Sequence, residues 1–355
     1  MRRRGFLASP LALLAAQTSA AVAYPAVRPG LALEFPRDHG SHPNFRTEWW
    51  YITGWAKGSD GIERGLQITF FRSRTGIGED NPSRFAPTQL LFAHAALADA
   101  SNGHLLHDQR AARAGLGLAE AAIGQTDVHI DDWSLKLSDA GYVVSVAARD
   151  FRFALRFQPR QPLLLQGERG YSRKGPESRQ ASYYYSRPQL AIDGSVSVKG
   201  RALEVTGKAW LDHEWSSEAL AGAASGWDWV GLNLADGGAL MAFRIRDRSG
   251  GTFWAGGALR AADGGDHVLE PGEIRFDPLR RWRSPRTQVE YPVALRLRAG
   301  DATYELEPLM DDQELDSRAS TGTIYWEGAV RAREGNRLAG EGYLELTGYW
   351  KPLRF

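Results

Sequence analysis

The sequence of 355 residues contains no cysteine, which excludes disulfides and paired-cysteine metal or redox motifs. It also lacks an excess of charge, because 43 Lys and Arg residues balance 42 Asp and Glu residues. The lack of a basic surplus argues against a dedicated nucleic-acid partner. Beyond the first residues there is no apolar run long enough to span a bilayer, so we expect no transmembrane segment in the mature protein.

The N-terminus has the features of an export signal. Arg3-Arg4-Gly5-Phe6-Leu7 matches the twin-arginine pattern, an apolar run follows over residues 11–16, and Ala21-Val22-Ala23 is a small-x-small cleavage signal. We therefore expect residues 1–23 to be removed near Ala23 and the mature protein to be periplasmic or secreted. Twin-arginine export carries folded chains, and folding in the reducing cytosol agrees with the absence of cysteine.

Helical periodicity is rare in the sequence, and only residues 110–122 and 216–221 are expected to form short helices. Alternation of apolar and polar residues instead recurs between Gly, Asp and Asn turns, for example over residues 48–55, 142–148 and 240–245. Many short strands at this spacing predict an all-β fold of antiparallel sheets. The length after the leader exceeds one comfortable core, and we place the domains at residues 24–190 and 191–355.

The most informative motif is Trp210-Leu211-Asp212-His213-Glu214-Trp215, in which three ionisable residues interrupt a strand-like aromatic run. In an extended strand Asp212 and Glu214 point to one side and His213 to the other, so the three cannot bind one metal ion. Desolvation and mutual repulsion would shift their pKa values, which suits acid and base catalysis. We therefore take Asp212, His213 and Glu214 as catalytic candidates. The alternative is a charged rim at the end of a strand.

Other predicted strands also carry carboxylates and aromatic rings on a common face, including Glu48 with Trp50, Tyr325 with Glu327, and Tyr343 with Glu345. Buried carboxylates are rare unless they are paired or line a site. We predict a pocket near the domain junction. The candidate ligand-binding residues are Glu48, Trp50, His94, Tyr184, Trp215, Trp229, Arg244, Tyr325, Glu327, Tyr343 and Glu345.

Two structural alternatives to this pocket remain open. The glutamates could form buried ion pairs with Arg244 or Arg246, or they could hold the two domains together. His39 and His42 invite interpretation as metal ligands, but they lie in a Gly-containing loop without a third spaced ligand. We expect them to be surface histidines and predict no metal site and no cofactor.

In its ordered motifs the chain resembles the AttH-like proteins, which include the carotenoid 1,2-hydratases. The motifs are Thr47-Glu48-Trp49-Trp50-Tyr51-Ile52-Thr53-Gly54, Phe92-Ala93-His94-Ala95-Ala96-Leu97, Tyr184-Tyr185-Ser186, the Asp212 motif, Trp227-Asp228-Trp229, Tyr325-Trp326-Glu327-Gly328 and Gly342-Tyr343-Leu344-Glu345-Leu346-Thr347-Gly348-Tyr349. The resemblance implies two lipocalin-like (calycin) antiparallel β-barrels packed side by side, with a pocket for a hydrophobic ligand.

The resemblance also implies two functions for that pocket. The first is binding of a lipid or isoprenoid, and the second is cofactor-independent lyase or hydrolase activity, such as hydration of an isoprenoid alkene. Hydration needs an acid, a base and shelter for a cation. We expect the acid and base from the Asp212 motif, and the shelter from Trp50, Trp215 and Trp229. The sequence after the motif, Leu240-Met241-Ala242-Phe243-Arg244, lacks the further acid expected of a hydratase. No pattern predicts an oligomeric state.

Overall fold

Two antiparallel β-sheets form the protein in a computed structural model that describes residues 22–353. Almost all of the leader, including the twin-arginine motif, lies outside the described residues. The prediction of an all-β fold is confirmed, since the described part of the chain contains strands and three short 3-10 helices but no α-helix. The 3-10 helices are η1 (Arg37–His39), η2 (Ala100–Asn102) and η3 (Pro271–Glu273).

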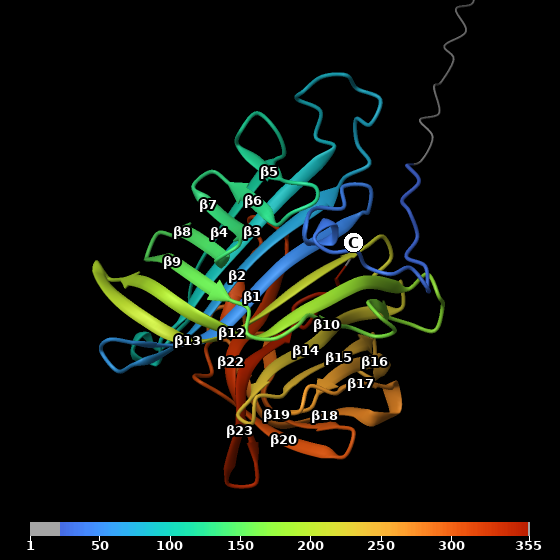
Figure 1. The fold of residues 1–355 in the computed structure, drawn as a ribbon. Helices are drawn as coiled ribbons and strands as arrows, with labels where there is room; N and C mark the ends of the chain where they lie inside the picture. Colours follow the sequence, from blue (N-terminus) through green and yellow to red (C-terminus); the bar gives the residue numbers. More distant parts are fainter. Residues whose placement is uncertain (1–21, 354–355) are drawn as a thin grey trace, which may run out of the picture.

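The first sheet has thirteen strands and the upper position in Figure 1. Its strands are β1 (Thr47–Gly58), β2 (Glu63–Arg74), β3 (Gln89–Ala98), β4 (Leu106–Arg113), β5 (Ala119–Ala121), β6 (Asp127–Ile130), β7 (Trp133–Ser138), β8 (Gly141–Ala147), β9 (Phe151–Gln158), β10 (Leu164–Leu165), β11 (Tyr171–Arg173), β12 (Ala181–Val198) and β13 (Arg201–Ser216). The order along the sheet is β4-β3-β2-β1-β13-β12-β9-β8-β7-β6-β5. Because β6 also packs against β3 and β4, the sheet curls on itself around an apolar interior.

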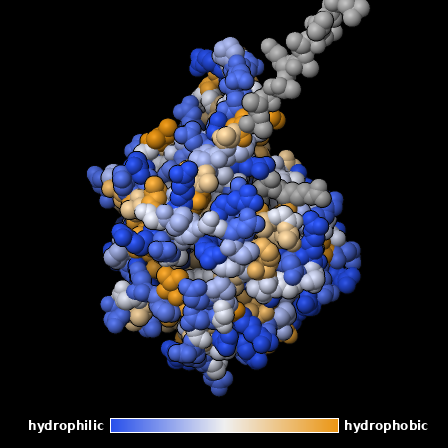
Figure 2. Space-filling model, turned by 90° about the vertical axis from the view of Figure 1, so that its right-hand side faces the viewer, coloured by the Kyte–Doolittle hydropathy of each residue, from blue (hydrophilic) through white to orange (hydrophobic). Residues whose placement is uncertain are grey.

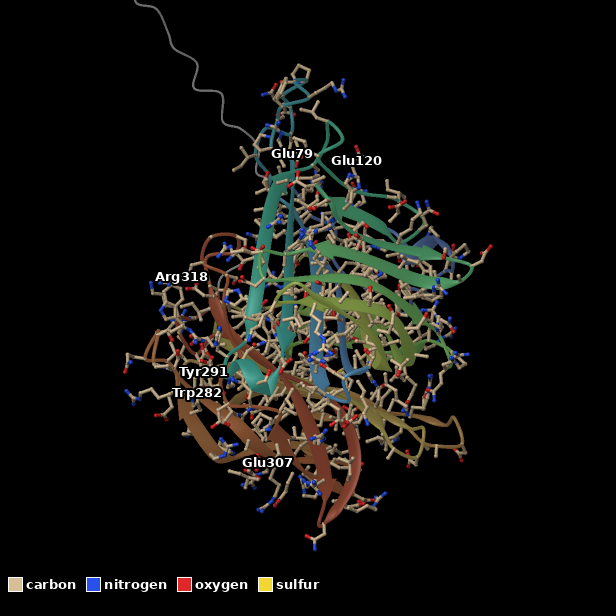
Figure 3. All side chains as sticks on the ribbon, turned by 90° about the vertical axis from the view of Figure 1, so that its left-hand side faces the viewer. Glu79, Glu120, Trp282, Tyr291, Glu307 and Arg318 are labelled. Carbon is tan, nitrogen blue, oxygen red and sulfur yellow. The ribbon has the colours of Figure 1, made fainter. Side chains whose placement is uncertain are left out.

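The second sheet has ten strands and lies below the first in Figure 1. Its strands are β14 (Ala224–Leu234), β15 (Ala239–Asp247), β16 (Thr252–Arg260), β17 (Asp266–Leu269), β18 (Ile274–Arg283), β19 (Glu290–Ala299), β20 (Ala302–Pro308), β21 (Glu314–Asp316), β22 (Ile324–Glu334) and β23 (Arg337–Leu346). Strand β18 packs against β15 and β16, so this sheet curls as well. Figure 3 marks the two bodies, with Trp282 and Tyr291 on the second sheet and Glu79 and Glu120 at the far end of the first.

The sheets divide between β13 and β14. The predicted boundary after residue 190 falls inside β12, and both β12 and β13 belong to the first sheet. The helix expected over residues 110–122 is wrong, because this segment contains the end of β4 and all of β5. The helix expected over residues 216–221 is also wrong. In both segments pairing with neighbouring strands or loop geometry overrides local helix propensity.

Apolar residues form one cluster inside each sheet, and a third cluster and a smaller fourth cluster lie between the sheets. Tyr51, Trp55 and Trp210 contribute to the third cluster from the first sheet, and Trp229 and Phe243 from the second. Polar residues predominate on the face in Figure 2, where apolar residues are scattered. No helix within residues 22–353 has the length and apolar character needed to cross a bilayer. The inter-sheet cluster is therefore the place where outward-facing side chains of both sheets meet.

Candidate active site between the two sheets

A cavity of about 770 Å³ lies at the junction of the two sheets. The first sheet and its loops supply Trp49, Tyr51, His94, Lys174, Tyr184, Asp212 and Glu214 to its lining, and the second supplies Trp227, Trp229, Phe243, Tyr325, Glu327 and Glu345. Aromatic rings thus make up much of the wall, and carboxyl groups enter from both sheets. The predicted pocket at the domain junction has this location.

Cross-strand pairing decides which residues of the first sheet face the cavity. In the β1–β13 register, Tyr51 lies opposite Asp212 and Trp49 lies opposite Glu214. Directly paired residues point to the same face of a sheet, and the next residues point to the other. His213 therefore points away from the cavity, as strand alternation predicted.

Asp212 is a buried carboxyl group held by three donors. Tyr184 donates to Oδ2 at 2.7 Å, while Ser186 and the Trp210 indole donate to Oδ1 at 2.5 and 2.7 Å. Burial nevertheless raises the pKa of Asp212 to about 7, against the opposing effect of these hydrogen bonds. The Glu214 charge acts in the same direction as burial. Asp212 can therefore hold a proton close to neutral pH.

Two more carboxyl groups face the cavity from the second sheet. Glu327 and Glu345 are direct cross-strand partners in the β22–β23 pair. Burial, and then the charge of Glu345, raise the pKa of Glu327 well above its usual range. Burial also raises the pKa of Glu345 to about 7, although the Trp227 indole donates to it at 3.2 Å. Since like charges at this spacing repel, we expect the pair to retain at least one proton at neutral pH.

Lys174 balances the remaining carboxylate, Glu214. Its Nζ lies 3.0 Å from Glu214 Oε1, and also 4.2 and 4.8 Å from the ring centres of Phe243 and Tyr184. Both charged groups are almost fully buried. No sequence pattern points to Lys174, because it lies just after β11 in a Gly- and Pro-rich segment without periodicity. Among the described residues, the ion pair between Lys174 and Glu214 leaves Asp212 as the carboxyl group of β13 without a cationic partner in the cavity wall.

Four predicted site residues lie instead in the interior of the first sheet, namely Glu48, Trp50, His213 and Trp215. Trp50 is opposite His213, and Glu48 is opposite Trp215, on the face that points away from the cavity. The Trp50 and His213 rings stack with centres 4.7 Å apart, and Trp50 and Trp215 are both buried. The expectation that Trp50 and Trp215 line the pocket is therefore wrong, because strand alternation groups residues by face without saying which face is which.

Glu48 lies at the cavity border, but its carboxylate is fully buried and faces the same interior. Arg72 Nε donates to Glu48 Oε2 at 2.8 Å, and His42 and His213 approach Oε1. Hydrogen bonds from both histidines and the Arg72 charge outweigh burial and hold the pKa of Glu48 well below its usual range. Burial lowers the pKa of His213, against the effect of Glu48.

Arg244 does not pair with any of the three glutamates. Arg244 and Arg246 both donate to Asp228, at 2.6 and 3.0 Å. The alternative in which these arginines form ion pairs with the glutamates is therefore wrong. Arg244 and Tyr343 are outside the cavity lining, and Tyr343 is buried in the inter-sheet cluster.

His94 and Tyr325 do line the cavity and meet across the two sheets. His94 Nδ1 lies 2.7 Å from the Tyr325 hydroxyl, and His94 Nε2 lies 2.8 Å from Ser320 Oγ. Burial lowers the pKa of His94 to about 3, so its ring is neutral at physiological pH. Tyr184 and Trp229 also meet across the sheets, because the Trp229 indole donates to the Tyr184 hydroxyl at 3.1 Å.

The AttH-like family matches the chain over residues 26–349. The chain belongs to this family. An AttH protein from Nitrosomonas europaea has a crystal structure that is 52% identical, with a TM-score of 0.86, over 92% of this chain and 100% of that one. The resemblance drawn from the sequence motifs is thereby confirmed. No curated protein matches the chain.

Two more distant solved structures share the fold of this AttH-like protein. Kievitone hydratase from Nectria haematococca is 14% identical with a TM-score of 0.70, over 93% of this chain and 97% of that one. CghA, solved with Sch210972, is 13% identical with a TM-score of 0.52, over 85% of this chain and 89% of that one. At such identities the likeness shows the fold alone, which confirms the predicted lipocalin-like class.

Proposed function

We propose that this AttH-like protein binds an apolar small molecule, a lipid or an isoprenoid, in the cavity between its sheets. The volume of about 770 Å³ carries the proposal, because ligand pockets have volumes of about 300 to 1,000 Å³, with mostly apolar walls and a few placed polar groups. Trp229, Phe243 and Tyr51 supply the apolar wall. The position between two packed bodies is also typical of ligand sites.

Unsatisfied polar atoms support a ligand with a polar group. Among the described residues, Tyr51 Oη and Glu327 Oε1 are buried without a hydrogen bond of good geometry. The two side chains are neighbours that affect each other's pKa, and native proteins seldom leave such atoms without a well-formed hydrogen bond, so one ligand group or water between them is expected. A hydroxyl or carbonyl group on an otherwise apolar molecule would supply partners to both.

Replacement of two alanines by tryptophan in one loop tests this binding site. Ala219 lines the cavity, whereas Ala223 is exposed in the same loop. We expect Ala219→Trp to fill part of the cavity and weaken binding of a fluorescent fatty acid at least ten-fold, while Ala223→Trp binds like the wild type. Equal binding by both variants would place the apolar site elsewhere, and no binding by the wild type would remove the proposal.

A second candidate function is acid-catalysed hydration of an isoprenoid alkene, and the raised pKa of Asp212 favours it. Asp212 would transfer its proton to one alkene carbon, and the face of Trp229 would stabilise the tertiary cation. Water would then add to the cation and lose a proton to Glu345, which gives a tertiary alcohol. His213 has no part in these steps because it faces the other side of β13. The fold neighbour named kievitone hydratase supports the reaction class.

Turnover separates the enzyme from the carrier. Purified protein is incubated with an acyclic isoprenoid in H₂¹⁸O, and the alcohol product is measured by mass spectrometry. We expect ¹⁸O-labelled alcohol with the wild type and at least a hundred-fold less with Asp212→Asn at unchanged fatty-acid binding. A carrier gives no labelled alcohol in either case, which would leave binding as the function.

We further propose that the protein acts after export to the periplasm or beyond. The support is the sequence Arg3-Arg4-Gly5-Phe6-Leu7 with its apolar run and Ala21-Val22-Ala23. A ligand of lipid character is available at membranes on that side, and a carrier or modifying enzyme there needs no cytosolic cofactor.

A further inference from the structure

His42, Glu48 and His213 form a compact cluster inside the first sheet, on the opposite side of β13 from the cavity. One potential ligand atom from each residue lies within 4.8 Å of the other two. The expectation that His42 and His39 lie at the surface is wrong. The His42 side chain is 17% exposed and His39 is buried, because the segment containing η1 folds over the end of the sheet. This fold brings the third ligand that the sequence spacing did not show.

Both imidazole rings aim at the same oxygen atom. His42 Nδ1 lies 2.7 Å from Glu48 Oε1, and His213 Nε2 lies 3.0 Å from it. In a tetrahedral zinc site with ligand bonds of about 2.0 to 2.1 Å, neighbouring ligand atoms are about 3.3 Å apart. The two nitrogen–oxygen distances are thus shorter than this spacing by about 0.6 and 0.3 Å, and the two ring nitrogens lie within 4.8 Å of each other, so local side-chain shifts would bring the three atoms around one ion.

The surroundings fix each ligand in the way that metal sites require. Each histidine has its other ring nitrogen close to a second group: His213 Nδ1 lies 3.1 Å from the Tyr185 hydroxyl, and His42 Nε2 lies 3.3 Å from Asp38 Oδ1. Such outer partners set the tautomer and orientation of metal-binding histidines. Trp215 stacks on His42 with ring centres 3.7 Å apart, which holds that ring in place.

The remaining oxygen of Glu48 is also fixed. Arg72 Nε, Ser41 Oγ and the His42 backbone N–H donate to Oε2, at 2.8, 3.1 and 2.8 Å. Oε1 faces the two imidazoles and accepts a longer contact of 3.1 Å from the same backbone N–H. A carboxylate held in this way can bind a metal through one oxygen only. Around the cluster, Arg72 pairs with Glu48 and Arg37 pairs with Asp38.

We propose that His42, Glu48 and His213 bind one divalent transition-metal ion of the zinc type, through Nδ1, Oε1 and Nε2. Two imidazoles and one carboxylate suit such ions, whereas Mg²⁺ and Ca²⁺ prefer oxygen ligands alone. Three protein ligands leave a fourth position for water, as in catalytic zinc sites. The ion would tie the segment before β1 to β1 and β13. Its site is separate from the carboxyl groups of the proposed function.

Zinc binding to the tag-free protein tests this site. The protein is treated with a chelator and dialysed, then titrated with ZnCl₂ and separately with MgCl₂ by calorimetry, with thermal melting in parallel. We expect one Zn²⁺ per chain with a dissociation constant below about 1 μM and a higher melting temperature, and neither effect with Mg²⁺ at 1 mM.

Three variants assign the ligands. His42→Gln and Glu48→Gln should each weaken Zn²⁺ binding at least ten-fold. The control His267→Gln, at a side chain that is 63% exposed, should bind like the wild type. Near-ultraviolet circular dichroism checks that each variant is folded without metal. If a variant does not fold, zinc-dependent protection of His42 against diethyl pyrocarbonate in the wild type replaces it. No stoichiometric Zn²⁺ binding, equal binding of Mg²⁺, or unchanged binding in His42→Gln would overturn the site.

Discussion

Replacing Asp212 by Asn should make the protein more stable at high pH. The change keeps the size of the side chain and removes its charge. Burial raises the pKa of Asp212 from 3.8 to about 7, so the folded state holds this proton more tightly than the unfolded state. Stability from Asp212 is then fully present below about pH 4 and is lost as the pH rises to about 7. Asn cannot ionise, so the variant does not lose stability through this position as the pH rises.

The size of the effect follows from the pKa difference. One pKa unit corresponds to about 1.4 kcal/mol, so the rise from 3.8 to about 7 corresponds to about 4 kcal/mol in total. About a third of this is already lost at pH 5, because the unfolded carboxyl is ionised there. Between pH 5 and pH 8 the free energy of unfolding of Asp212→Asn should therefore rise by about 2 to 3 kcal/mol relative to the wild type.

Urea unfolding at the two pH values, followed by tryptophan fluorescence, measures this difference. At pH 5 the variant should be more stable than the wild type by up to about 1.5 kcal/mol, the share already lost there, less the cost of the acceptor oxygen that Asn lacks for its three donors. The exposed control Asp132→Asn should stay within about 0.5 kcal/mol of the wild type at both pH values. A constant difference between Asp212→Asn and the wild type would refute the buried, protonated acid.

Two further changes test other parts of the site, and a third tests the export signal. Glu327→Gln removes a buried carboxyl group with a strongly raised pKa, so its melting temperature relative to the wild type should rise from pH 5.5 to pH 8.5; a fall would contradict the repulsion between Glu327 and Glu345. Lys174→Met leaves the buried Glu214 unpaired and should cost about 3 to 5 kcal/mol in urea unfolding. Adding Glu214→Gln should recover at least 1 kcal/mol of this loss, and a further loss would speak against the pair. Arg3→Lys with Arg4→Lys should leave unprocessed precursor in the cytoplasm on fractionation, whereas normal processing would indicate the general secretory route.

The sequence predicted the all-β class because strand alternation is a local property. Residues 48–55 and 240–245 lie within β1 and β15. The helix expected over residues 110–122 failed because Ala and Arg favour helices in isolation, whereas β4 pairs with β3 over eight residues. Local propensity thus competes with pairing partners that are distant in the sequence.

The same limit explains the errors at the site. Strand alternation predicted that Asp212 and Glu214 lie on one face of the sheet and His213 on the other. The structure shows the same arrangement. It could not show that Trp49 and Tyr51, rather than Glu48 and Trp50, share the face of Asp212, because that depends on the register between β1 and β13. Lys174 lies in an aperiodic loop, so only the three-dimensional contact with Glu214 shows its role.

A crystal structure of the protein with a bound fatty acid or acyclic isoprenoid tests the central claim most directly. We predict ligand density between the sheets, against Trp229 and Phe243, with a polar group within hydrogen-bond distance of Asp212 or Glu327. Density instead inside the first sheet, over Trp50 and His213, would contradict the assignment of the inter-sheet cavity as the ligand site.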